Sequence, residues 1–96
     1  MTNYLTIKNL ECFATNDVLF SISTDDGQTW KYYNNKSWNI NNSSGMNIDT
    51  LQSITSDEWL EILTGATSYR FRCLLPNTTS SVGKIYINHI LKTDNE

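Results

Sequence analysis

The 96-residue chain has little positive charge, a single histidine and no long apolar run. Its 7 Lys and Arg residues against 10 Asp and Glu residues give a net charge of −3, so the phosphate backbone of a nucleic acid would repel it. No basic cluster predicts binding to a membrane surface, and no apolar stretch is long enough to cross a bilayer. We therefore expect no nucleic-acid partner and no membrane insertion.

The scarcity of histidine and cysteine argues against a metal site and against catalysis by a nucleophile. With His89 as the one histidine, no histidine-based metal cluster can form, and we expect no metal and no other cofactor. Cys12 and Cys73 are favoured as buried thiols, and a disulfide between them stays open. Cys73 and His89 could form a nucleophile pair, but Cys73 lies in an apolar stripe where an inert thiol is expected. The chain is therefore predicted not to be an enzyme.

The residues that are present suffice for one domain over residues 1–96, with 92–96 as a polar, frayed tail. Apolar residues make up 39% of the chain and aromatic residues 11%, which is too much for a disordered segment. The first four residues, Met1 to Tyr4, lack the charged and apolar regions of a secretory signal, so we expect synthesis in a cytoplasm.

Alternating apolar residues predict about six short strands, at 3–13, 17–24, 28–33, 37–40, 67–75 and 82–91. In the first strand, a change of the apolar face predicts a bulge near Asn9. Residues 56–64 have helical spacing after a capping box that begins at Thr55, and a preceding helical turn at 49–54 is left open. The elements predict a mainly β fold: a β-sandwich with one short helical connection, in a strand order that stays open.

One local motif is specific. Residues 23–30 match the Asp-box pattern, Ser/Thr-x-Asp-x-Gly-x-Thr-Trp, through Ser23, Asp25, Gly27, Thr29 and Trp30. Gly27 accepts the positive φ of a tight hairpin turn, and Asp25 is placed to accept backbone N–H bonds across it. Trp30 is expected to enter the core and anchor the hairpin. In sialidases and other β folds that carry it, the Asp box is a folding element remote from the catalytic site.

A longer resemblance covers residues 18–90. The residues that carry it are Phe20 to Ser23, Asp25 to Trp30, Trp38, Gly45, Met46, Leu51, Ile54, Trp59, Tyr69 to Arg72 and Lys84 to Ile87. In this order they resemble small modules in tail and minor structural proteins of phages and prophages of Gram-positive bacteria. The resemblance implies a virion component, made in the cytoplasm of a bacterial host, with a receptor-binding or assembly role. It also implies other virion proteins or further copies of the chain as partners. Whether the chain is a complete protein or a module of a longer one stays open.

The alternative is a free-standing, lectin-like carbohydrate-binding domain, with a cell-surface glycan as ligand. Aromatic rings stack on pyranose faces, and amides bond sugar hydroxyls. If Trp30 and Tyr32 face the core, strand alternation exposes Tyr33. The candidate ligand-binding residues are Tyr33, Asn34, Asn35, Asn39, Arg70 and Arg72. The two arginines would bind an acidic sugar or a partner carboxylate, unless they pair with acidic side chains across strands. The alternative for Trp30, Tyr32 and Trp38 is that they are simply core residues.

Overall fold

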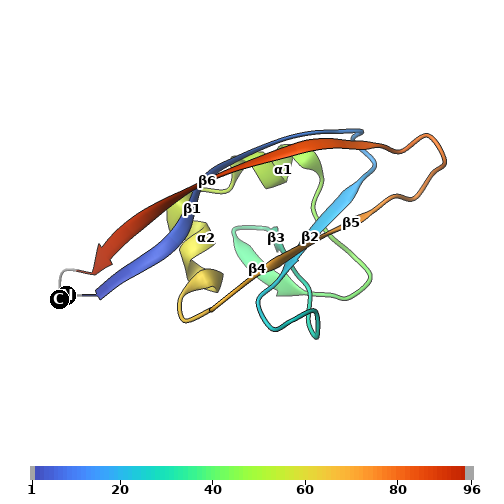
Figure 1. The fold of residues 1–96 in the computed structure, drawn as a ribbon. Coiled ribbons are helices and arrows are strands. Elements are labelled where there is room, and N and C mark those ends of the chain that lie inside the picture. Colours follow the sequence, from blue (N-terminus) through green and yellow to red (C-terminus); the bar gives the residue numbers. More distant parts are fainter. Residues whose placement is uncertain (1, 95–96) are drawn as a thin grey trace.

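A computed structural model of the chain describes residues 2–94. Its elements follow in the order β1 (Thr2–Ala14), β2 (Leu19–Ser23), β3 (Lys31–Asn34), β4 (Ser37–Ile40), α1 (Ile48–Ser53), α2 (Ser56–Leu63), β5 (Arg70–Leu74) and β6 (Val82–Asp94). The predicted mainly β fold with two sheets is confirmed. β1 and β6 form a long antiparallel ribbon, and the other four strands form an antiparallel sheet in the order β4-β3-β2-β5 (Figure 1).

The helical connection consists of two short helices rather than one. Asn47 begins α1 by accepting a hydrogen bond from the Thr50 amide at 2.9 Å. The predicted capping box begins α2, with Thr55 and Glu58 each satisfying the other's backbone N–H. Within residues 2–94, neither helix is long and apolar enough to cross a membrane.

The core lies where the helices pack against the ribbon and the sheet. Both helices contact β1, and the Thr6 hydroxyl on β1 donates to the Ser56 carbonyl at 2.9 Å. Trp59 on α2 is fully buried, and its ring centroid lies 5.3 Å from that of Trp38 on β4 and 5.9 Å from that of Phe71 on β5. The helices are therefore layered between the ribbon and one face of the sheet (Figure 1).

Both predicted hairpin turns are present. Asp26 and Gly27 have φ of 60° and 86°, and Asn35 and Lys36 have φ of 52° and 62°. Positive φ at both central positions is what the two-residue type I′ turn between β3 and β4 requires. Lys36 is an unfavourable residue for this backbone, because its Cβ crowds the following carbonyl. Asp26 and Gly27 lie within the longer loop that joins Ser23 of β2 to Lys31 of β3.

The predicted bulge in β1 is also present. The register with β6 shifts between Ile7 and Asn9, so that Ile7, Leu10 and Cys12 are all buried although strict alternation would separate them. The frayed tail is wrong for 92–94, because β6 continues to Asp94 and pairs with β1 to its end. The rest of the expected tail, 95–96, lies outside the described residues.

The expectation that Trp30 enters the core is wrong. Trp30 is half-buried on the outer face of the sheet, where the Arg72 guanidinium lies 4.6 Å from its ring centroid. Arg72 and Ser21 are cross-strand partners there, opposite the face that buries Phe20. The core tryptophan is instead Trp59, because α2 covers the inner face of the sheet.

Candidate functional site

A groove opens where β3 diverges from β2. The two strands pair only at Ile22 and Lys31. Beyond that point Met46 takes the place beside β2, exchanging backbone hydrogen bonds of 2.7 and 2.8 Å with Phe20. A groove of about 320 Å³ remains between β3 and this segment. It is lined by Leu19, Tyr32, Tyr33, Asn34, Ser44, Gly45, Met46, Asn47 and Thr50.

The wall opposite β3 is held close to the sheet by Gly45. A Cβ at this position would lie 2.6 Å from the Phe20 carbonyl oxygen, well inside contact distance. Only glycine lets the backbone approach this closely, and Asn47, two residues later, caps α1. The backbone of this wall is therefore held directly against β2.

Tyr33 lines the groove but is not the freely exposed ring that the alternation predicted. It faces α2: its ring packs edge-on against Trp38 at 5.2 Å, and its hydroxyl donates to the Glu58 carboxylate. That hydrogen bond raises the pKa of Tyr33 to about 12. The pKa of Glu58 is lowered, first by the Thr55 amide and then by Tyr33. The prediction failed because Trp30 and Tyr32, not Tyr33, lie on the face away from α2.

The remaining polar side chains of the groove are free to meet a ligand. The Tyr32 hydroxyl, the Asn34 amide, the Ser44 and Thr50 hydroxyls and the Asn47 amide nitrogen make no hydrogen bond to any other described residue. None of the nine lining residues is charged. Donors and acceptors beside two tyrosines suit a neutral, polyhydroxylated ligand better than an ion.

Of the three predicted asparagines, Asn34 alone lines the groove. Asn35 supplies the left-handed conformation of the β3–β4 turn. The Asn39 amide donates to the carbonyls of Asn34 and Ser37 at 3.3 and 3.1 Å. Asn35 and Asn39 therefore serve the hairpin itself.

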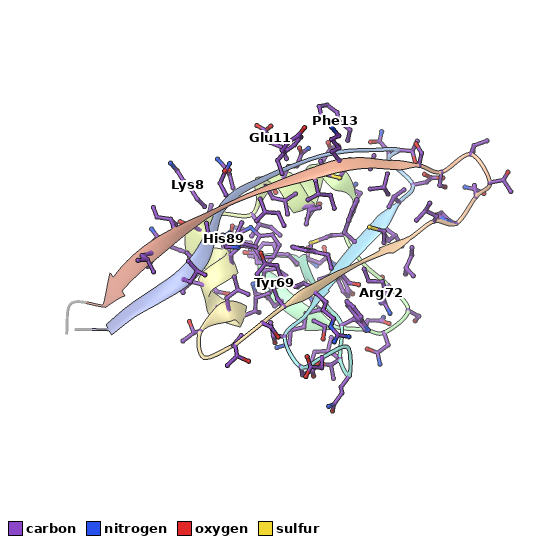
Figure 2. All side chains as sticks on the ribbon, in the orientation of Figure 1. Lys8, Glu11, Phe13, Tyr69, Arg72 and His89 are labelled. Atoms are coloured by element: carbon purple, nitrogen blue, oxygen red, sulfur yellow. The ribbon has the colours of Figure 1, made fainter. Side chains whose placement is uncertain are left out.

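The two predicted arginines lie elsewhere, on the outer face of the sheet. Arg70 pairs with Asp26 at 3.7 Å, and both side chains are well exposed. Arg72, labelled beside β5 in Figure 2, has no acidic partner among the described residues. Its guanidinium lies over Trp30, and its Nε donates to the Ser21 hydroxyl at 3.2 Å. Arg72 is thus partly covered by Trp30, and the six predicted residues do not form one site.

The hydrogen bonds of the 23–30 turn are structural. The Asp25 carboxylate accepts from the Thr29 amide at 2.9 Å and from the Thr29 hydroxyl at 2.5 Å. The Ser23 hydroxyl donates to Asp25 at 2.7 Å and accepts from the Gly27 amide at 2.8 Å. Bonds from Thr29 and Ser23 lower the pKa of Asp25 from 3.8 to about 2. These side chains hydrogen-bond within the turn and hold it closed, which leaves them little capacity to bind a ligand.

Four polar groove residues were not predicted as ligand-binding from the sequence: Tyr32, Ser44, Asn47 and Thr50. Tyr32 was assigned to the core; it is half-buried and packs against the core cluster, and it also lines the groove. The other three lie in or just after the polar loop 41–47, and their approach to β3 depends on the Met46–Phe20 pairing, which no local pattern predicts.

Within residues 2–94, no three His, Cys, Asp or Glu side chains gather closely enough to hold a metal ion. Comparison of the chain with family models, with curated proteins and with solved structures finds no match.

Proposed function

We propose that this domain is a non-enzymatic carbohydrate-binding module, with the groove beside Tyr32 as its sugar site. The observation that carries the proposal is the convergence of unpaired amides and hydroxyls on an uncharged groove with tyrosine walls. Binding sites for small ligands combine apolar or aromatic walls with a few placed polar groups in this way.

The different contacts of the two tyrosines support this role. Tyr33 is engaged with Trp38 and Glu58, which fixes one wall of the groove. Tyr32 has a hydroxyl without a partner among the described residues and offers its ring and its hydroxyl together. A rigid wall reduces the side-chain ordering that binding would otherwise require. The ligand class is a neutral sugar, because an acidic one would find no cation in the lining.

The biological setting that we propose is the tail or receptor-binding apparatus of a phage-like particle, where the module would recognise a glycan on the host surface. Support for the setting comes from the order of motifs over residues 18–90. The free-standing lectin is the second candidate, and the same groove serves both.

The sugar site is tested by screening the purified domain on a glycan array and titrating the best neutral saccharide by calorimetry. Tyr32→Ala should weaken binding by about tenfold or more, since it removes a central aromatic contact. Tyr86→Ala is the matched control, because Tyr86 is an exposed tyrosine on β6 away from the groove. Absence of any bound saccharide, or equal losses in both variants, would overturn the proposal.

The setting is tested by the size of the protein in solution. A stable trimer or larger assembly in sedimentation experiments supports the particle role. A monomer that binds sugar with millimolar affinity supports the free-standing lectin.

A further inference from the structure

A second cavity lies at the open end of the β1–β6 ribbon. It has a volume of about 160 Å³ and is lined by Leu5, Leu63, Ala66, Thr67, Ser68, Tyr69 and His89. Ile7 pairs with His89 in the ribbon and is buried in the core, so His89 and the nearby Leu5 face the same side. The end of α2 and the segment leading into β5 supply the opposite wall. None of these residues lines the groove beside Tyr32.

The cavity has largely apolar walls, with Thr67 and Ser68 also in its lining, and one polar end. Leu5, Leu63 and Ala66 supply carbon surface. At the polar end the Tyr69 hydroxyl and His89 Nε2 are hydrogen-bonded at 2.7 Å. Figure 2 shows Tyr69 and His89 between the ribbon and the segment that enters β5.

The aromatic side chains around the polar end brace one another. The Tyr69 ring packs edge-on against Phe71, with centroids 5.6 Å apart, and the Tyr69 and His89 rings lie 6.0 Å apart. Burial also raises the pKa of Tyr69, which keeps its hydroxyl protonated and able to donate. The Tyr69–His89 pair is therefore an exposed polar group at the rim of the cavity, held in place by the packing of Tyr69 against Phe71.

The cavity is open to solvent on the side of Leu5, Thr67, Ser68 and His89, which are exposed, and its volume of about 160 Å³ has room for one small ring. An apolar protein cavity of roughly 150 Å³ holds a benzene ring. A bonded hydroxyl–imidazole pair still has a lone pair on the hydroxyl oxygen, which can accept a hydrogen bond from a ligand. A ligand matched to both features is one six-membered ring with one hydroxyl group.

We infer that this cavity binds a small monocyclic phenol, with the ring against Leu63 and Ala66 and the hydroxyl at the Tyr69–His89 pair. The site is independent of the sugar groove and of the function proposed for it. Because the two sites share no lining residue, we expect each ligand to bind without displacing the other.

The inference is tested by titrating the ¹⁵N-labelled domain with phenol and with toluene in NMR experiments. Phenol should give saturable shifts centred on Leu63, Ala66 to Tyr69 and His89, and should bind more tightly than toluene. In the double variant Tyr69→Phe/His89→Leu, phenol should lose its advantage over toluene by about three- to tenfold, the value of one hydrogen bond. Toluene binding should persist, which shows that the variant is folded.

Ala66→Leu fills the cavity with a larger side chain and should abolish saturable binding of both rings. Tyr32→Ala is the control at the other site and should leave phenol binding unchanged while weakening sugar binding. Circular dichroism and thermal melting establish that each variant is folded. Phenol shifts that do not saturate, or that survive Ala66→Leu, would overturn the inference whatever the outcome at the sugar groove.

Discussion

Asp25 shows how one side chain can hold a turn together. Its carboxylate accepts three hydrogen bonds, from the Thr29 amide, the Thr29 hydroxyl and the Ser23 hydroxyl. Each of these bonds favours the ionised form, which is why its pKa falls to about 2. Asp17 is similar, since bonds from Asn77 and Ser80 lower its pKa to about 2.

A depressed carboxyl pKa makes the stability of the folded protein depend on pH. Between an ordinary value of 3.8 and about 2, the unfolded chain binds more protons than the folded one, so stability falls as the pH falls through this window. We expect urea unfolding midpoints that are steady above pH 5 and decline toward pH 2. Asp25→Asn should lower the midpoint at neutral pH and flatten the decline.

Asp26→Asn is the matched control for that experiment. Asp26 is the neighbouring carboxylate with no hydrogen bond to the turn, and asparagine tolerates its φ of 60°. This variant should keep the acid sensitivity of the natural sequence. Equal pH profiles for Asp25→Asn and the natural chain would show that the hydrogen bonds around Asp25 contribute no stability.

Single residues also show where sequence patterns are ambiguous. Alternation separates Trp30 and Tyr32 from Tyr33, and that separation is observed. It does not say which set faces the core, because both contain aromatic rings. The structure buries the Tyr33 side through Trp38 and Trp59, and leaves Trp30 under the guanidinium group of Arg72.

Among the elements, those fixed by local chemistry could be predicted. The capping box at Thr55, the two hairpin turns and the β1 bulge each depend on a few neighbouring residues, and all four are present. The pairing of the loop at Met46 with β2 joins residues far apart in sequence and could not be predicted. The groove was missed for the same reason, since that pairing forms one of its walls.

The close approach at Gly45 gives a test of how the groove wall is held. Gly45→Ala places a methyl group against the Phe20 carbonyl and should break the Met46–Phe20 pairing, lowering the free energy of unfolding by about 1–3 kcal/mol. Sugar affinity should fall as well, because the wall moves. Chemical unfolding and calorimetry measure the two effects.

Gly65→Asn serves as the control for Gly45→Ala. Gly65 has a φ of 81° with open space around it, and asparagine tolerates this conformation. This variant should be close to the natural chain in both stability and sugar affinity. A Gly45→Ala protein as stable as the Gly65→Asn protein would contradict the role of the close approach.

At the scale of the whole molecule, the two cysteines report on the integrity of the core. Both are free thiols; Cys12 is buried and Cys73 is half-buried. Burial raises the pKa of both thiols, and the nearby Cys73 raises that of Cys12 further. Raised pKa values and poor access both reduce the thiolate available for reaction.

We therefore expect the folded protein to react slowly with an aromatic disulfide reagent at pH 8, and Cys73 to react before Cys12. In urea both thiols should react fast. The single variants Cys12→Ser and Cys73→Ser assign the two phases, each retaining one of them. If both thiols of the native protein reacted as fast as they do in urea, the ribbon would not stay packed on the helices.

The sequence by itself determined the β-rich character, the positions of the turns and the start of α2, because these depend on side-chain spacing and on hydrogen bonds within a few residues. Tertiary structure alone decided which face of the sheet is covered, and thereby that Trp59 and not Trp30 fills the core. It also decided that Tyr32 borders the groove and that Tyr69 meets His89. These outcomes depend on how α2 and the ribbon dock on the sheet, and burial of apolar surface between distant segments governs that docking.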